Sequence, residues 1–250
     1  MHHAGRRLLL ADLQARIAHL ERGSRRPCET LRFGIAALDA HLPADGLPLG
    51  LLHEIVEDGA GACHAATARL FVAGILARLN GPVLWCLPRQ DLFAPGLASV
   101  GLDPNRVIFV ETVREADVLP AMEEGLRHCG LAAVVGELAR LRFTPSRRLQ
   151  LAAEASGVTA FALRRWREGA GLEATCSTTR WRVGPAPSSP LPAPGLGRAR
   201  WRVELVRCRG AEPRSWLMEA CDEEGRLALP PKLAHRPRPQ AERAPRAAPG

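Results

Sequence analysis

Short apolar runs alternate with amphipathic segments over residues 31–165, and this alternation constrains the fold more than any other feature of the chain. The apolar runs have the length of strands, and the segments between them carry apolar residues at helical spacing. Pro82, the pair Asp103 and Pro104, and Gly157 separate the segments, as turns between strands and helices require. The pattern predicts an α/β fold with a mostly parallel central sheet flanked by helices.

The element boundaries follow from the same pattern. Strands are predicted at residues 52–56, 83–87, 107–111, 132–135 and 158–163. Helices or turns are predicted between them at residues 65–79, 92–100, 115–128 and 146–155. Three further alternating runs follow Arg167, at residues 176–183, 200–208 and 215–220. We expect these runs to form antiparallel strands that extend the sheet at its C-terminal side.

The domain organisation is predicted from composition. A chain of 250 residues is long enough for one sizeable α/β domain, which we place at residues 27–229. Residues 1–26 are predicted to form an N-terminal amphipathic helix and a basic linker. Residues 230–250 are rich in Pro, Ala and Arg with nothing to bury, so a disordered basic tail is expected there.

The N-terminal helix is predicted from an apolar stripe. Leu9, Leu13, Ile17 and Leu20 recur at helical spacing with polar residues between them. A stripe of this kind, joined to the core by a short basic linker, either packs on its own domain or docks on a partner protein.

The segment LLHEIVEDGAGACHAATARL has the context of a phosphate-binding loop, because a strand enters a glycine-containing turn that leads into a long helix. Gly59 and Gly61 are present, but Cys63, His64 and Ala65 stand where such a loop needs Lys and Ser or Thr. Lys232, in the tail, is the single lysine of the sequence. No alignment can therefore supply the ammonium group that neutralises the β and γ phosphates, and the chain is predicted not to hydrolyse ATP.

A second departure concerns the carboxylate that holds magnesium. In the run AAVVGEL, Gly136 occupies the end of the strand where an Asp is needed. Glu137 follows, but adjacent residues on a strand point to opposite faces, so we expect it to point away from this site.

Positive charge is concentrated in one segment. Residues 1–141 have a net charge of −2, whereas residues 142–209 contain 13 Arg and only 4 acidic residues. Such a segment is suited to polyanions or to an acidic partner. Because 33 of the basic residues are Arg, a compositional bias is the alternative. The candidate nucleic-acid or partner contacts are Arg164, Arg165, Arg167, Arg180, Arg182, Arg200, Arg202, Arg207 and Arg209.

Four of the five tryptophans, Trp166, Trp181, Trp201 and Trp216, fall in or just after this segment. Arg interleaved with aromatic residues is typical of a platform for single-stranded nucleic acid. However, period-two alternation places a tryptophan and its flanking arginines on opposite sheet faces. We therefore expect Trp181 and Trp201 to be core residues, with Arg180, Arg182, Arg200 and Arg202 forming a solvated stripe.

Metal, disulfide and membrane sites are not expected. The seven cysteines show no C-x-x-C spacing, and several lie in apolar runs. No uninterrupted apolar segment is long enough to span a bilayer, and the N-terminus is too polar for a signal peptide. We predict a cytoplasmic protein without cofactor.

The run LRFGIAALDAHLPADGLPLGLLHEI is similar to the entry of RecA recombinases, and the similarity continues through residue 165. The resemblance implies a RecA-like core, with three departures. The position of the RecA catalytic Glu falls near Pro88, and the loop that would bind DNA after residues 158–165 is short. Arg207 and Arg209 match the basic pair that reaches the nucleotide of a neighbouring subunit, but both are Arg instead of Lys.

With its degenerate nucleotide motifs, an N-terminal amphipathic helix, and the runs TTRWRV and RWRVELVRCRGAEP, the chain resembles the ImuA family over residues 8–229. This resemblance implies a non-catalytic accessory role in DNA-damage-induced (SOS) mutagenesis and translesion synthesis. The partners that it implies are an ImuB-type inactive Y-family polymerase homologue, RecA and an error-prone DNA polymerase.

Three alternatives stay open at this point. A residual RecA-like ATPase or recombinase predicts ATP turnover and filaments, which the lysine count opposes. A single-stranded nucleic-acid-binding module predicts a salt-sensitive gel shift. A cell-division inhibitor predicts filamentous cells on overexpression.

Overall fold

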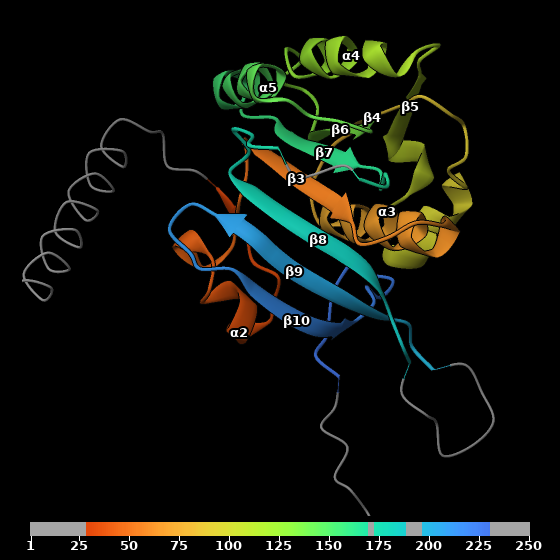
Figure 1. The fold of residues 1–250 in the computed structure, drawn as a ribbon, viewed down its shortest axis with the longest axis vertical. Coiled ribbons are helices and arrows are strands. Elements are labelled where there is room, and N and C mark those ends of the chain that lie inside the picture. The colour runs from red at the N-terminus through yellow and green to blue at the C-terminus, as the bar shows by residue number, and fades with distance from the viewer. Residues whose placement is uncertain (1–28, 170–172, 189–196, 231–250) are drawn as a thin grey trace, which may run out of the picture.

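The computed structural model describes residues 29–169, 173–188 and 197–230 of the chain (Figure 1). The predicted N-terminal helix with Leu9, Leu13, Ile17 and Leu20 lies outside the described residues. The predicted tail also lies outside them, apart from Pro230. The division of the chain into three segments therefore stays a prediction.

An eight-stranded sheet forms the centre of the molecule, in the order β10-β9-β8-β3-β7-β6-β4-β5. The first strands along the chain are β3 (Leu52–Glu57), β4 (Val83–Leu87), β5 (Val107–Glu111) and β6 (Ala133–Leu138). The remaining strands are β7 (Thr159–Arg164), β8 (Thr179–Ala186), β9 (Arg200–Cys208) and β10 (Arg214–Glu219).

The predicted fold class is confirmed: the sheet is mostly parallel and is extended at the C-terminal side by antiparallel strands. β9 pairs antiparallel with both β8 and β10. The prediction of an antiparallel strand at residues 176–183 is correct for one neighbour only, because β8 pairs antiparallel with β9 but parallel with β3. After β7 the chain returns to the end of the sheet where β3 begins, and β8 can start there only in the parallel sense.

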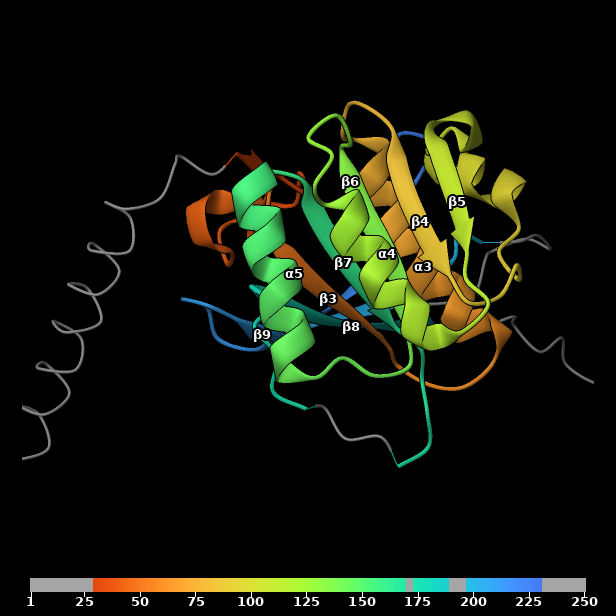
Figure 2. The same ribbon diagram turned by 90° about the horizontal axis from the view of Figure 1, so that it is seen from above.

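Helices cover both faces of the parallel part of the sheet (Figures 1 and 2). One face carries α3 (Ala62–Ala77), and the opposite face carries α4 (Val118–Gly125) and α5 (Phe143–Ser156). Short 3₁₀ turns complete the connections, namely η2 (Ala94–Val100), η3 (Pro104–Arg106) and η4 (Glu115–Asp117). The helix predicted at residues 115–128 is thus a 3₁₀ turn followed by a shorter α-helix.

Two apolar cores explain this arrangement. On the α3 face, Phe71 of α3 packs with Trp181 of β8 and Trp201 of β9. On the other face, Leu52 of β3 and Leu149 of α5 belong to a second buried cluster. All six residues of β3 are buried, as expected for a central parallel strand that is covered on both sides.

A small layer precedes the sheet. It consists of β1 (Thr30–Leu31), α2 (Ala36–Asp39), η1 (Pro43–Asp45) and β2 (Leu47–Pro48), with β1 and β2 antiparallel. The buried carboxylate of Asp39 accepts hydrogen bonds from the backbone N–H groups of Phe33 (2.7 Å) and Gly34 (2.8 Å). These bonds fix the turn between β1 and α2. No helix within residues 29–169, 173–188 and 197–230 has the length and hydropathy required to cross a membrane.

Candidate functional site

The turn between β3 and α3 is filled by a side chain of the protein. Gly61 precedes α3 with φ of 102°, a conformation that favours glycine. The imidazole of His64 lies against Gly59, since a Cβ atom at Gly59 would be 2.7 Å from its Cε1 atom. Cys63 is exposed at the start of the helix. The positions predicted for a degenerate phosphate loop therefore lie together at one turn, and His64 folds back over it.

Gly136 and Glu137 point to opposite faces of β6. A Cβ atom at Gly136 would collide with the Sδ atom of Met122 in α4, so an Asp could stand there only if the Met122 side chain moved. The carboxylate of Glu137 lies on the α3 face, where it is fully buried and contacts Arg69. The expectation that Glu137 points away from the site was therefore wrong, because α3 and the β3–α3 turn lie on the face that Glu137 occupies.

Glu137 is bound by cationic and neutral donors of the protein, and we call this group the Glu137 cluster. Arg69 Nε donates to Glu137 Oε1 (2.8 Å) and Arg69 Nη2 to Glu137 Oε2 (2.8 Å). The indole of Trp85 also donates to Oε1 (3.2 Å). Oε1 of Glu137 thus accepts two hydrogen bonds, and the Arg69 guanidinium contacts both carboxylate oxygens in a bidentate pair.

The Glu137 cluster continues to the surface through Asp91. Both Arg69 and Arg165 donate to the Asp91 carboxylate, the latter at 2.7 Å. Although partial burial alone would raise the pKa of Asp91, these hydrogen bonds lower it. Asp91 and Arg165 remain partly exposed, so the cluster is buried at Glu137 and open at its outer end.

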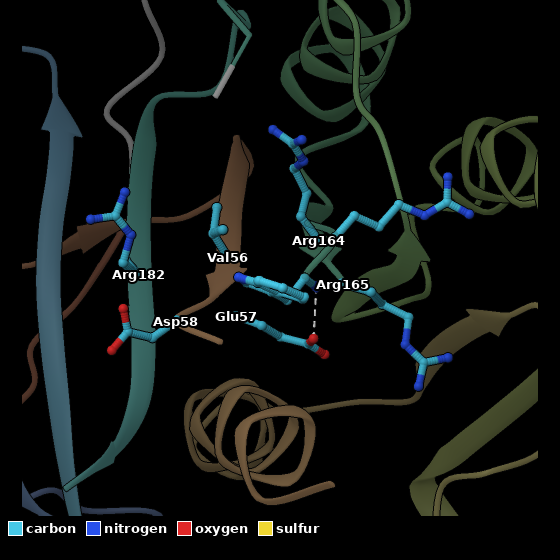
Figure 3. Close-up of a pocket in the computed structure, with 8 residues that line it drawn as sticks. Val56, Glu57, Asp58, Arg164, Arg165 and Arg182 are labelled. Carbon is cyan, nitrogen blue, oxygen red and sulfur yellow. Dashed lines mark hydrogen bonds between the residues drawn. The ribbon is translucent and has the colours of Figure 1, made fainter. Parts of the chain in front are cut away.

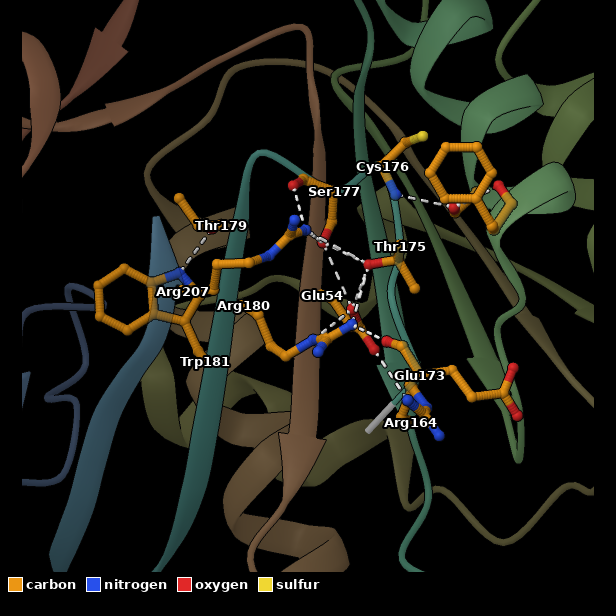
Figure 4. A network of polar contacts seen from close by, with 12 residues as sticks. Glu54, Arg164, Glu173, Thr175, Cys176, Ser177, Thr179, Arg180, Trp181 and Arg207 are labelled. Atoms are coloured by element: carbon orange, nitrogen blue, oxygen red, sulfur yellow. Dashed lines mark hydrogen bonds and ion pairs between the residues drawn. The ribbon is translucent and has the colours of Figure 1, made fainter. Parts of the chain in front are cut away.

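A second cluster surrounds Glu54 on the opposite face of the sheet (Figure 4). Glu54 is fully buried and accepts from Arg164 Nη1 (3.1 Å) and Arg180 Nε (2.7 Å). The hydroxyls of Thr175 (2.8 Å) and Ser177 (3.3 Å) complete its hydrogen bonds. We call these five residues the Glu54 cluster. It joins β3, β7, β8 and the segment that leads into β8.

A pocket of about 280 Å³ opens at the carboxyl ends of β3 and β7, beside the middle of β8 (Figure 3). It is lined by Val56, Glu57, Asp58, Arg164, Arg165, Trp166, Arg167 and Arg182. Glu57 is buried and accepts a hydrogen bond from the backbone N–H of Trp166 (2.7 Å). Burial raises the pKa of Glu57 against the opposing effect of this hydrogen bond. Ligands of open α/β sheets bind at this end of the strands.

The structure divides the predicted arginine contacts into three groups. Arg164 and Arg180 are buried in the Glu54 cluster, so the prediction that Arg180 lies in a solvated stripe was wrong. The reason is that Glu54 needs a cation beside it and residues 173–177 cover Arg180. Arg165 belongs to the Glu137 cluster, and Arg207 turns inward to donate to the Ser177 backbone carbonyl (2.6 Å).

The remaining arginines are accessible. Arg167 and Arg202 are exposed, and Arg182 and Arg200 are partly exposed. Arg209 is also exposed, in the turn after β9. Arg182 pairs with Glu204 (2.9 Å), and Arg202 pairs with Asp58 (3.0 Å). Whether any of them contacts a nucleic acid or a protein stays a prediction.

The tryptophans also divide into buried and exposed residues. The prediction that Trp181 and Trp201 are core residues is confirmed, since they are 0% and 3% exposed. Trp85 and Trp216 are also buried, whereas Trp166 is 41% exposed at the pocket.

Glu54 and Arg69 were not recognised from the sequence. A charged residue within a strand that is otherwise apolar, as in LLHEIV, is the available signal for Glu54, because a central strand leaves no exposed face. Its partners are 110 or more residues away and give no local signal. Within the described part of the chain, no three His, Cys, Asp or Glu side chains gather as a metal site would require.

No protein family model matches the chain. Two curated relatives do: Protein ImuA of Caulobacter vibrioides strain NA1000 / CB15N and Protein ImuA of Caulobacter vibrioides strain ATCC 19089 / CIP 103742 / CB 15. Each is 42% identical over 213 residues, which cover 80% of this chain and 87% of the relative. Identity at this level over most of both sequences shows common family membership, and the chain therefore belongs to the ImuA family.

Proposed function

We propose that this chain is a non-catalytic accessory protein of DNA-damage-induced mutagenesis that acts in translesion synthesis by binding an ImuB-type polymerase homologue. Membership of the ImuA family supports the mutagenic role. The absence of catalysis is supported by the residues at the β3–α3 turn and at β6.

The state of Glu137 is the observation that carries the non-catalytic assignment. A magnesium ion at this end of the sheet needs a carboxylate with free lone pairs. Both oxygens of Glu137 already accept from Arg69, and Oε1 accepts from Trp85 as well. A metal ion would have to displace a bidentate guanidinium in a buried position, where breaking an ion pair costs several kcal/mol.

The phosphate side of the same site is equally unsuited to a triphosphate. His64 occupies the turn, and the described residues contain no lysine. Glu57 and Asp58 lie directly before the turn, and neither supplies a cation that could hold a triphosphate there. The protein thus contributes neither the cation nor the metal-holding group that phosphoryl transfer requires.

ATP turnover by purified protein tests the non-catalytic assignment. We expect no phosphate release above the buffer control, with or without single-stranded DNA. As a matched control, the Arg69→Met variant should also be inactive, because freeing Glu137 does not supply the missing lysine. DNA-stimulated turnover by the wild-type chain that survives further purification would overturn the assignment.

The accessory role has a separate test in cells. Deletion should lower damage-induced mutation without affecting undamaged growth, and a pull-down with the full chain should recover the ImuB-type protein. The predicted partner helix gives a sharp variant: Leu13→Asp with Ile17→Asp should abolish recovery, whereas Arg22→Gln, which helical spacing places opposite the apolar stripe, should not. RecA and an error-prone polymerase are the further partners proposed. Unchanged mutation frequency in the deletion strain would contradict the role.

A further inference from the structure

The pocket at the carboxyl ends of β3 and β7, beside the middle of β8, contains an exposed tryptophan and exposed arginines. The packing of the fold does not require these side chains, and the proposed function does not use them. The pocket is distinct from the two buried clusters, although Arg164 of the Glu54 cluster and Arg165 of the Glu137 cluster contribute to its wall. Figure 3 shows these two arginines directed away from each other, as neighbours on a strand are. At about 280 Å³ it is close to the lower end of the roughly 300 to 1,000 Å³ typical of ligand sites.

The two acidic residues of the pocket already have partners. Asp58 accepts from Arg202 Nη1 at 3.0 Å. Glu57 holds the Trp166 backbone N–H through Oε2, and burial raises its pKa. Asp58 is therefore offset by Arg202, whereas the Oε1 atom of Glu57 has no hydrogen-bond partner within the described residues.

The arginines are less completely paired. The side chain of Arg167 is 57% exposed, and its carboxylate neighbour within the described residues, Glu115, is 3.9 Å away, beyond hydrogen-bond range. Arg182 is paired with Glu204, but both side chains are about one-third exposed. An exposed pair of this kind contributes little and can be exchanged for a phosphate. The pocket thus offers cationic donors to an anion.

Trp166 supplies the aromatic surface. It is the one tryptophan that is not buried, and its position is fixed because Glu57 holds its backbone. Among the described residues its indole contacts no other aromatic ring, whereas Trp181 and Trp201 each pack against Phe71. An exposed indole beside guanidinium groups is the combination on which bases of single-stranded nucleic acid stack.

The register of β8 and β9 extends the basic surface beyond the pocket. Arg182 lies opposite Glu204, Gly184 opposite Arg202, and Ala186 opposite Arg200. Because directly paired residues share a sheet face and every second residue faces the same way, Arg182, Arg202 and Arg200 lie on one face. A polyanion that leaves the pocket along this face meets further guanidinium groups.

We propose that this pocket binds a nucleotide unit of single-stranded DNA, with the base stacked on Trp166 and its phosphate bound by Arg167 and Arg182. The phosphates on one side of that nucleotide follow Arg202 and Arg200 along β8 and β9. The proposal does not depend on the mutagenic role, because it rests on the residues of the pocket and on the arginines of β9.

Binding of labelled oligo(dT) of about 12 nucleotides to the full chain, followed by fluorescence anisotropy, tests the proposal. Trp166→Ala should raise the Kd roughly tenfold, and Trp166→Phe should raise it less, because phenylalanine retains part of the stacking surface. Arg167→Gln should weaken binding and reduce the slope of log K against log salt by about one.

Matched controls separate these effects from a general loss of charge or aromatic surface. Phe93→Ala removes an aromatic side chain that is 76% exposed and does not line the pocket. Arg147→Gln removes an exposed arginine of α5 that has no ion pair within the described residues. Both should bind as the wild type does, and all variants should keep the wild-type Tm, because the altered side chains are exposed.

Two further ligands distinguish the parts of the proposal. An abasic oligonucleotide has the same phosphates without bases, and we expect it to bind more weakly than oligo(dT) and to be insensitive to Trp166→Ala. Free dTMP and ATP should fail to displace the oligonucleotide at equal nucleotide concentration, since they lack the phosphates that follow β8 and β9.

Several results would overturn the proposal. Wild-type affinity in both Trp166→Ala and Arg167→Gln would exclude the pocket, and equal binding of the abasic strand would exclude stacking. Displacement by free nucleotide would assign the pocket to a mononucleotide. Loss of the ImuB-type protein in Trp166→Ala with unchanged DNA affinity would make the pocket a protein-docking surface.

Discussion

The Glu54 cluster and the Glu137 cluster each neutralise a buried carboxylate, on opposite faces of one sheet, but they differ in how far they are open to solvent. In each, a carboxylate that is fully buried is neutralised by arginines. The Glu54 cluster is closed, since Arg164 and Arg180 are buried with it. The Glu137 cluster reaches solvent through Asp91 and Arg165.

The difference indicates what each cluster does. A closed ion-pair group that joins strands far apart in sequence specifies how those strands align in the sheet. Its charges are inaccessible to any ligand. The open one lies at the carboxyl ends of the strands, which is the end of an open α/β sheet where ligands bind. We therefore interpret the first as a determinant of the fold, whereas the second remains within reach of solvent.

The largest effect is expected from Glu54→Gln, which leaves two buried guanidinium groups without a counter-charge. Removing one partner from a buried ion pair costs about 3 to 5 kcal/mol of unfolding free energy. Urea denaturation followed by circular dichroism measures this loss. Glu204→Gln, which breaks a half-exposed pair, is the matched control and should cost no more than about 1 kcal/mol. Equal losses in the two variants would contradict the comparison.

The next effect is a dependence of stability on pH that originates next to Glu54. His53 is fully buried, and burial lowers its pKa to about 4 from an ordinary value of 6.5. Its contribution to stability is therefore present above pH 6.5 and is lost as the pH falls towards 4, by about 3 kcal/mol in total. Denaturation curves between pH 7 and pH 4 should show this loss, and a His53→Asn variant should be flatter over that window. Parallel curves for the two proteins would show that His53 is not the source.

Glu137→Gln should have a smaller effect than Glu54→Gln, about 2 kcal/mol, because Asp91 still pairs with Arg69 and the outer end of the cluster is hydrated. The same urea denaturation measures it. Adding Asp91→Asn should bring the loss up to that of Glu54→Gln. If Glu137→Gln alone already equals Glu54→Gln, the distinction between a closed and an open cluster fails.

The smallest effect is expected at the surface of β8. Arg182→Gln removes a half-exposed pair with Glu204 and should change the unfolding free energy by less than about 1 kcal/mol. Thermal unfolding at two salt concentrations is the measurement. A larger change would mean that an exposed ion pair on β8 contributes as much to the unfolding free energy as the buried ion pairs do.

The extent of prediction from sequence differs between these regions. The strands at residues 83–87, 107–111 and 200–208 have the predicted bounds, because apolar runs between turn residues define them locally. The direction of β8 was not predictable, since it depends on the path of the chain after β7. The predicted turn between a strand and a long helix at residues 58–61 is present, whereas Glu54 and Arg69 were missed because their partners lie on other strands and helices.

The Glu54 cluster also has a consequence for where the chain can be divided. Its ion pairs connect positions 110 and 126 residues apart, so the central strand acquires its counter-charges only after most of the sequence has been synthesised. A fragment ending near residue 169 would retain Arg164 but lack Arg180, Thr175 and Ser177, leaving one buried carboxylate only partly satisfied. Fragments intended for expression or interaction mapping should therefore include β8, even where the region of interest ends before it.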